Sequence, residues 1–176
     1  MKVNYFFAPV HTDVDVWGFY FCMWLNKLIF KKTFRMKIGI INGPNLNLLG
    51  KREIDIYGNM PFENYFSQLQ SLFPSIDFYY YQSNVEGELI NEIQNIGFDY
   101  DGIVLNPGGY THTSVALGDA IAAVKTPVIE VHISNVHARE EFRKISHVSA
   151  KCKGTISGLG LKGYELAVKW FADKVH

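Results

Sequence analysis

From Met36 onward, short runs of hydrophobic residues alternate with segments in which hydrophobic residues recur every three or four positions. The runs predict buried strands at 37–41, 77–82, 102–105, 127–131 and 154–157. The periodic segments predict helices at 62–73, between Ser83 and Gly97, at 114–124 and at 162–174. Repeated strand–helix units predict a parallel sheet that is covered by helices on both faces through right-handed connections.

Two of the predicted helices carry finer expectations. The sequence Ser83-x-x-Glu86 has the spacing of a capping box, so Ser83 is expected to be the N-cap of the second helix. In the last helix, Leu166, Trp170 and Phe171 are expected to face the core.

Five parallel strands suit a doubly wound α/β fold of flavodoxin-like type, with strand order 2-1-3-4-5. In that order the cleft lies outside the carboxyl ends of the first and third strands. Asn45, Asn106 and His132 all follow strand ends, after the first, third and fourth strands. We therefore expect these three polar side chains to converge on one site.

The segment from His132 to Arg143 has the richest chemistry in the chain. A short helix is expected after His132, with Ser134 or Asn135 as its N-cap, and Arg139 and Arg143 four apart on one face. Such a segment suits binding of a small anion and transfer of a proton. The alternative interpretation is an ordinary surface loop followed by a charged helix.

Glu130 precedes His132 by two residues, which places both side chains on the same face of a strand. A carboxylate in that position can orient the imidazole and favour its charged form. A histidine that is merely satisfied by hydrogen bonds at a strand end is the alternative.

Composition narrows the function classes. The chain has 176 residues, 48% of them hydrophobic and 19% charged, which fits one globular domain. Its 17 basic and 17 acidic residues cancel, so no nucleic-acid partner is expected. Cys22 and Cys152 form no CxxC or CxxH pair, and the six histidines form no HxxxH pattern, so no metal is expected.

Residues 1–35 differ in pattern from the remainder. The aromatic run at 14–25 is shorter than a membrane-spanning helix and has neither the basic flank nor the cleavage site of a signal peptide. Three interpretations stay open: an extension upstream of the true start, which we favour, a membrane-associating segment, or an appendage that packs on the domain. We expect a non-catalytic extension at 1–35, a catalytic domain at 36–176, and no membrane partner.

Two glycine patterns imitate nucleotide-binding motifs. Gly158-x-Gly160-x-x-Gly163 follows a strand and opens a helix, but the chain ends before a second strand could bring an acidic residue to a ribose. We interpret it as a tight strand-to-helix turn. The stretch from Gly43 to Lys51 has the wrong glycine spacing for a P-loop.

Three strings together closely resemble type II 3-dehydroquinate dehydratases, the 3-dehydroquinases of the shikimate pathway. They are Asn42-Gly43-Pro44-Asn45-Leu46-Asn47 with its continuation to Gly58, Asn106-Pro107-Gly108-Gly109-Tyr110-Thr111-His112-Thr113, and Glu130-Val131-His132-Ile133-Ser134-Asn135. The resemblance runs from Met36 to His176. It implies a lyase that dehydrates 3-dehydroquinate by β-elimination through an enolate, without a cofactor, in aromatic amino acid biosynthesis.

The resemblance also implies catalytic roles. Tyr57 is expected to accept the proton, Arg52 to stabilise the charge, and Asn45 to support the enolate oxygen. His132, oriented by Glu130, is expected to donate a proton to the leaving hydroxyl. Because the polar stretch around Arg52 and Tyr57 could also be an ordinary exposed loop, its interpretation as a lid over the site depends on the resemblance. The family's frequent proline after the Arg-Glu pair is Ile54 here.

For substrate binding, the resemblance implies that the Ile133 and Ser134 N–H groups and the Ser134 hydroxyl take the substrate carboxylate. Asn106, His112 and Arg143 are expected to hold the carboxylate and ring hydroxyls, and Arg139 to order the loop.

The resemblance implies a homododecamer built of trimers, in which Asp119 reaches the site of a neighbouring subunit. We also expect the protein to be cytoplasmic. The competing hypothesis is a non-catalytic flavodoxin-like module that binds a small molecule. It predicts the loss of Tyr57, Arg52 or His132, and all three are present.

Overall fold

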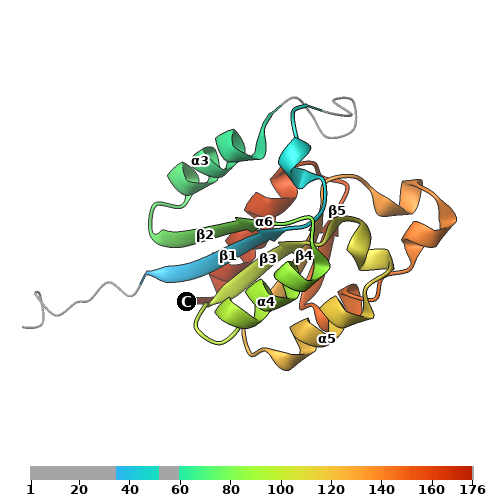
Figure 1. Cartoon of the computed structure of the whole chain (residues 1–176). Helices are drawn as coiled ribbons and strands as arrows, with labels where there is room; N and C mark the ends of the chain where they lie inside the picture. The colour runs from blue at the N-terminus through green and yellow to red at the C-terminus, as the bar shows by residue number, and fades with distance from the viewer. Residues whose placement is uncertain (1–34, 52–59, 176) are drawn as a thin grey trace, which may run out of the picture. The chain divides into compact units, whose positions relative to one another are not determined.

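The computed structural model describes residues 35–51 and 60–175, and five parallel strands form one sheet there (Figure 1). The strands are β1 (Met36–Asn42), β2 (Ile76–Gln82), β3 (Gly102–Asn106), β4 (Val128–His132) and β5 (Gly154–Ser157). Their order in the sheet is β2-β1-β3-β4-β5. The predicted fold class and strand order are confirmed, and each predicted strand agrees with the observed one to within one residue at each end.

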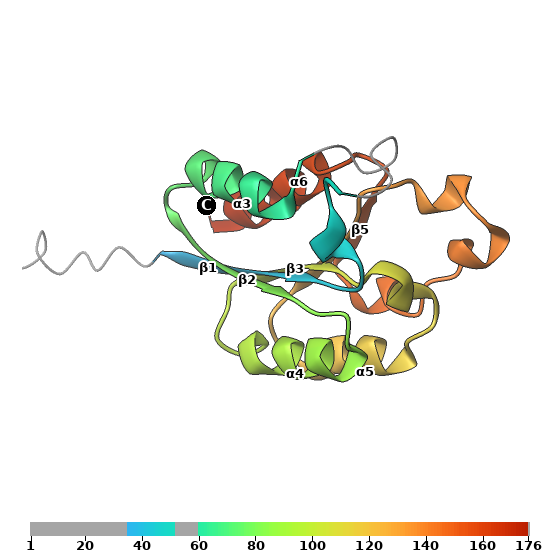
Figure 2. The same cartoon turned by 45° about the horizontal axis from the view of Figure 1, so that its top comes forward.

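In the described part of the chain, four α-helices cover the sheet in two layers. They are α3 (Phe62–Leu72), α4 (Glu86–Ile96), α5 (Val115–Ala123) and α6 (Lys162–Ala172). Figure 2 shows α3 and α6 on one face and α4 and α5 on the other. Short 3-10 helices complete the described chain: η1 (Leu46–Leu48), η2 (Gly108–His112), η3 (Val136–Ala138), η4 (Glu141–Lys144), η5 (Ser149–Lys151) and η6 (Asp173–Val175).

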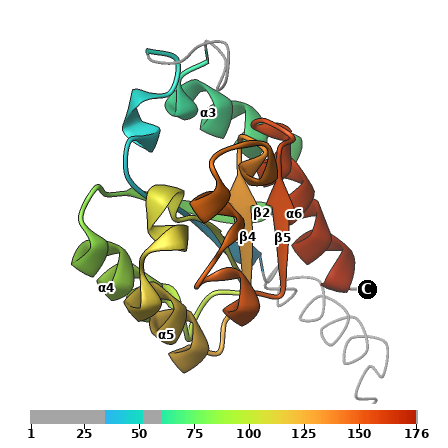
Figure 3. The same cartoon turned by 90° about the vertical axis from the view of Figure 1, so that its right-hand side faces the viewer.

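Alternation along the strands divides the core in two. Ile38 and Ile40 of β1 pack with α3 and α6, whereas Ile41 packs with α4 and α5. All three side chains are fully buried, and burying an aliphatic side chain of this size contributes about 1.5–3 kcal/mol. Figure 3 views the molecule from the right-hand side of Figure 1 and shows α3 and α6 on one side of the strands and α4 and α5 on the other.

The expectation that Leu166 of α6 faces the core is wrong. Leu166 is 37% exposed, because the buried stripe of α6 runs through Tyr164, Ala167, Val168 and Phe171 instead. Trp170 packs only partly buried against that core, and Phe171 is buried as expected.

The capping box at the start of α4 is also wrong. The N-cap of α4 is Val85, and the Ser83 hydroxyl donates to Glu88 Oε2 at 2.5 Å while accepting from the Val85 N–H at 2.9 Å. Ser83 therefore stabilises the turn before the helix, not the first helical N–H groups. The helix ends at Gly97, as expected. Among the described residues, no helix has the length and hydrophobicity needed to cross a membrane.

Candidate active site

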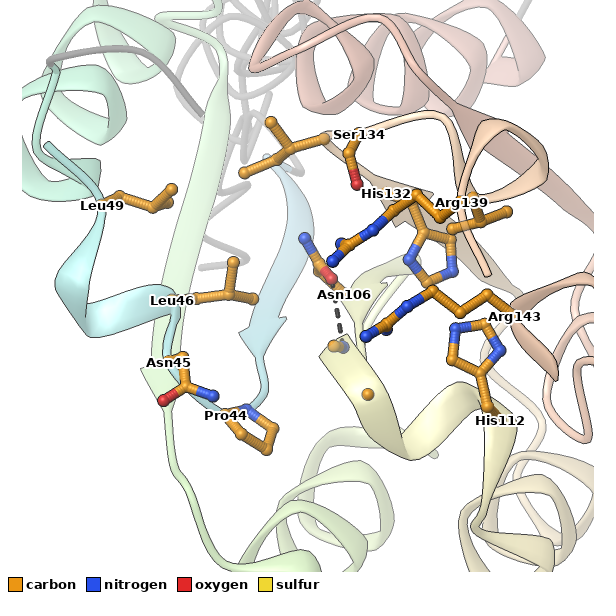
Figure 4. Close-up of a pocket in the computed structure, with 14 residues that line it drawn as sticks. Pro44, Asn45, Leu46, Leu49, Asn106, His112, His132, Ser134, Arg139 and Arg143 are labelled. Atoms are coloured by element: carbon orange, nitrogen blue, oxygen red, sulfur yellow. Dashed lines mark hydrogen bonds between the residues drawn. The ribbon is translucent and has the colours of Figure 1, made fainter. Parts of the chain in front are cut away.

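A pocket with a volume of about 200 Å³ lies at the carboxyl ends of β1, β3 and β4. Its walls are the loops that follow these strands, which diverge where the strand order reverses. The lining residues are Pro44, Asn45, Leu46, Leu49, Asn106, Gly108, Gly109, His112, His132, Ile133, Ser134, Val136, Arg139 and Arg143. Figure 4 shows the β1 loop on one side of the pocket, the histidines and arginines on the other, and Asn106 between them. The expected position of the cleft is confirmed.

The loop after β1 approaches the loop after β3 so closely that its first residue must be glycine. The Gly43 N–H donates to the Asn106 carbonyl at 2.7 Å, and a Cβ on Gly43 would lie 2.6 Å from the Pro107 carbonyl oxygen. Asn45 has a left-handed backbone with φ of 68°, which asparagine tolerates better than most residues. Its N–H donates to Asn84 Oδ1 at 2.9 Å. These contacts fix the Asn45 backbone at the pocket wall.

Asn106 lies between the two walls on a buried hydrogen-bond chain. Its Nδ2 donates to the Tyr164 phenol at 2.8 Å, and that phenol donates to Asn42 Oδ1 at 2.8 Å. Its Oδ1 accepts from the Gly108 N–H at 3.2 Å, the dashed line in Figure 4. Burial raises the pKa of Tyr164, so the phenol stays protonated. Sequence reasoning missed Tyr164, since a tyrosine on the buried face of a helix carries no local signal of a polar contact.

His132 and Glu130 form a buried pair at the end of β4. The distance between His132 Nε2 and Glu130 Oε1 is 2.7 Å, and their side chains are 8% and 0% exposed. The expectation that both lie on one strand face is confirmed. An ionised carboxylate can only accept, so Nε2–H donates to it, which leaves Nδ1 of His132 for a ligand.

Glu130 is ionised despite its burial. Burial by itself would raise the pKa of this carboxyl group. The hydrogen bond and charge of His132, together with the hydroxyls of Ser149 and Thr111, outweigh that effect and hold the pKa below its ordinary value of 4.5. The pair thus sets a fixed negative charge directly behind the imidazole.

His112 lies beside His132, with ring centroids 6.4 Å apart and nearly parallel planes. Its Nδ1 is 2.7 Å from the carbonyl oxygen of Ile145. Because that oxygen can only accept, Nδ1 carries the proton, and Nε2 is the nitrogen left for a ligand. Phe142 packs edge-on against the same ring. The two imidazoles are therefore each oriented by a contact outside the pocket.

The segment after β4 differs from the single helix that the sequence predicts. Asn135 is an N-cap, as expected, and its side chain accepts from the His137 N–H, but it caps only the single turn η3. The backbone is extended at Arg139 and Glu140 before η4 begins. Arg139 and Arg143 therefore do not share a helix face. Both still line the pocket. The Glu140 carboxylate contacts both, with Oε2 2.6 Å from Arg143 Nε and 3.6 Å from Arg139 Nε.

The pocket brings together most of the expected site residues in the described chain. Those that line it are Asn45, Asn106, His112, His132, Ile133, Ser134 and Arg143. Glu130 lies behind His132, and Asp119 is exposed on α5 and lines no part of the pocket. Arg52 and Tyr57 lie outside the described residues. Within 35–51 and 60–175, no three His, Cys, Asp or Glu side chains gather as a metal site would require.

Comparisons with known proteins agree with this geometry. Residues 36–172 match the family described as dehydroquinase class II. The chain is 53% identical over 144 residues to a 3-dehydroquinate dehydratase from Fusobacterium nucleatum, covering 78% of this chain and 97% of that one. It is similar to the type II dehydroquinase structure from Butyrivibrio crossotus, with a TM-score of 0.76 and 51% identity over 78% of this chain and 98% of that one.

A second solved structure, type II dehydroquinase from Propionibacterium acnes, has a TM-score of 0.73 and 40% identity over 78% of this chain and 96% of that one. The match covers most of the chain, includes every strand of the sheet and spans all the pocket-lining residues. The chain belongs to the class II dehydroquinase family of enzymes.

Proposed function

We propose that this enzyme dehydrates 3-dehydroquinate to 3-dehydroshikimate by β-elimination through an enolate, within aromatic amino acid biosynthesis. The observation that carries the proposal is the buried Glu130–His132 pair beside a pocket with two arginines. An elimination next to a ketone needs a base, a group that stabilises the enolate and an acid for the departing hydroxyl. A substrate with a carboxylate also needs cations, which Arg139 and Arg143 provide.

His132 serves as the acid. Glu130 engages Nε2, so Nδ1 delivers the proton to the leaving hydroxyl. The negative charge of Glu130 compensates the positive charge that His132 carries before the transfer. The family membership supports Tyr57 as the base and Arg52 as the cation that stabilises the tyrosinate, although both lie outside the described residues. Asn45, at the opposite wall of the pocket, supports the enolate oxygen.

The substrate carboxylate is proposed to bind the N–H groups of Ile133 and Ser134 and the Ser134 hydroxyl, which line the pocket just beyond His132. Asn106, His112 and Arg143 then hold the carboxylate and the ring hydroxyls. Asn106 suits this role because its amide is fixed from behind by Tyr164. Prior fixation lowers the entropy cost of orienting a polyhydroxylated ring.

A direct assay tests the proposal. 3-Dehydroquinate is added to the purified protein, and the ultraviolet absorbance of the conjugated enone product is followed. Turnover is expected in the unmodified chain, and His132→Ala should impair both substrate binding and the leaving-group step. Absence of product at high enzyme concentration would contradict the proposed reaction. Treatment with borohydride in the presence of substrate should leave activity intact, because the proposed mechanism forms no imine with a lysine.

We also propose that the enzyme works in the cytoplasm as a homododecamer built of trimers, with Asp119 reaching a neighbouring subunit's site. Its exposed position on α5, away from its own pocket, is compatible with such a contact. Residues 1–35 form a non-catalytic extension. Analytical ultracentrifugation tests the assembly, and a fully active monomer would contradict it.

A further inference from the structure

The buried carboxylate of Glu130 has more partners than His132. Its Oε1 accepts from the Thr111 hydroxyl as well as from His132 Nε2. Its Oε2 accepts from the Ser149 hydroxyl, and the Thr155 hydroxyl lies 3.3 Å away. Both oxygens of a fully buried carboxylate are thus surrounded by donors that come from η2, η5 and β5.

The direction of these hydrogen bonds is fixed by chemistry. An ionised carboxylate has no proton to give, so the Thr111 and Ser149 hydroxyls must donate. The Ser146 hydroxyl lies 2.8 Å from each of these two hydroxyl oxygens. It also accepts from the N–H groups of Val148 and Ser149, at 3.1 and 2.9 Å. Ser146 therefore anchors the two donors to the loop without itself contacting the carboxylate.

The two donors are held differently by the fold. Thr111 is fully buried, and its carbonyl accepts from the His147 N–H at 2.8 Å, which ties η2 to the loop that carries Ser149. Ser149 is half-buried at the start of η5. Neither hydroxyl lines the pocket. Any influence they have on the reaction must therefore pass through Glu130.

We propose that Thr111 and Ser149 are positioning residues of the active site: their hydroxyls hold Glu130 ionised and oriented, and through it they aim His132 into the pocket. This inference rests on the proposed function, in which His132 donates the proton to the leaving hydroxyl. A buried carboxylate without such donors would be expected to take up a proton and release the imidazole. The hydroxyls prevent this without placing a second cation beside His132.

Other ionisable groups near the pair matter for its titration. They are His112, whose ring lies against His132, the pocket-lining Arg139 and Arg143, and Cys152. Burial and the charge of Glu130 raise the pKa of Cys152 to about 12, so this thiol stays neutral. The two arginines are cationic throughout the working range. His112 is thus the one neighbour in this group whose titration must be separated from that of the pair.

Removing one of the two hydroxyls should raise the pH at which the Glu130–His132 pair takes up its proton. The hydroxyl dipoles stabilise most the state in which the pair carries a net charge of −1, with Glu130 ionised and His132 neutral. Loss of one hydroxyl therefore destabilises this state more than the protonated one. The pair should then bind its proton at a pH about one unit higher. A proton held more tightly is donated less readily, so the plateau kcat should fall about tenfold.

The test compares Thr111→Val and Ser149→Ala with the unmodified chain. The His132 ring resonances are followed by NMR against pH in the ligand-free protein, with His132→Asn used to assign them and His112→Asn to identify those of His112. The kcat is measured over the same pH range. Thr126→Val is the matched control. Thr126, two residues before β4 begins, is also a buried threonine. Its hydroxyl donates to the Tyr100 carbonyl at 2.9 Å. It should change neither readout.

Thr111→Ser restores a hydroxyl and should restore both the titration and kcat. An upward titration shift in Thr111→Val and Ser149→Ala, absent from Thr126→Val and Thr111→Ser, supports the inference. If Thr111→Val does not fold, the half-buried Ser149→Ala alone decides. An unshifted titration in Ser149→Ala overturns the inference. Because the NMR titration needs no substrate, it stands even if the unmodified chain fails to dehydrate 3-dehydroquinate, a result that would refute only the proposed function.

Discussion

Two pairs of ionisable residues lie at the pocket, Glu130 with His132 and Arg139 with Arg143, and the fold holds them in opposite ways. Glu130 and His132 are almost completely buried and are surrounded by hydroxyl donors from distant segments. Arg139 and Arg143 lie beside Glu140, whose side chain is 55% exposed. The backbone N–H of Glu140 and the Arg143 guanidinium lower the pKa of the Glu140 carboxyl group, so it too is ionised.

The difference in burial matches the two proposed tasks: the buried Glu130–His132 pair transfers a proton, and the two arginines bind an anion. Charges in the interior interact strongly and cannot lose a partner without leaving a buried charge uncompensated. Glu140 is exposed to solvent, so salt screens its ion pairs with the two arginines, and such pairs contribute little to stability. The buried pair should therefore be rigid and intolerant of substitution, whereas the arginines can exchange Glu140 for a substrate carboxylate at small cost.

The largest effect is expected from removing the proposed base, Tyr57, which acts together with the acid His132. Tyr57→Phe should lower kcat by about three orders of magnitude with little change in KM, because the proposed base acts on charge that develops in the transition state. Steady-state kinetics measure this. Tyr79→Phe, on β2 away from the pocket, is the control and should behave like the unmodified chain. A near-normal kcat in Tyr57→Phe would remove this residue from the role of base.

Glu130→Gln tests the buried pair most directly. The amide presents an N–H group where a carboxylate oxygen accepted protons, so at least one hydrogen bond is lost and the imidazole loses its counter-charge. We expect kcat to fall about a hundredfold and the free energy of unfolding to fall by about 1–3 kcal/mol. Kinetics and urea unfolding give the two numbers. Unchanged kcat would mean that the charge behind His132 is not needed.

The pH dependence of stability sharpens the same point. The folded-state pKa of Glu130 lies below 4.5, so its ionisation stabilises the fold above about pH 4.5, and that stabilisation is lost as pH falls through the folded pKa. The difference in unfolding free energy between the unmodified chain and Glu130→Gln should therefore shrink on acidification. A difference that is independent of pH would contradict ionisation of Glu130.

Glu140→Ala tests the arginine pair, and a smaller effect is expected. Loss of the carboxylate that orients the guanidiniums should raise KM about two- to fivefold with little change in kcat. The difference should diminish at high salt, which screens the original ion pair as well. The control is Glu141→Ala, which removes the neighbouring pair with Lys144 on η4. A large loss of kcat that persists at high salt would contradict the expected difference between the arginine pair and the Glu130–His132 pair.

The smallest effect is expected from removing residues 1–35. Every group proposed for either pair, or for the base, lies at or after Asn45. A protein starting at Met36 should match the full chain in kcat, KM and sedimentation, and it should be more soluble because an aromatic segment is gone. Lost activity or assembly would indicate that the segment docks on the domain. Sedimentation of only the full chain with lipid vesicles would indicate membrane attachment.

Local sequence pattern predicted the parts of the site that follow from strand register. Period-2 alternation placed Glu130 and His132 on one face of β4, and topology placed Asn45, Asn106 and His132 at one end of the sheet. The same pattern failed for the two arginines, because a separation of four residues occurs both within one helix and across an irregular segment. A separation of four suits one helix face, yet Arg139 is an extended residue that follows η3, whereas Arg143 lies in η4.

The sequence by itself determined the strand order, the end of the sheet that carries the pocket and the pairing of Glu130 with His132. The pairing follows from the period of two along a strand, whereas the strand order and the place of the pocket follow from the doubly wound fold that five strand–helix units suit. Only the tertiary structure decided the partners of the buried polar groups. Thr111 and Ser149 each lie 19 residues from Glu130, and Tyr164 lies 58 residues from Asn106. A hydroxyl or phenol carries no local sign of its distant partner, because only packing of the folded chain brings the two together.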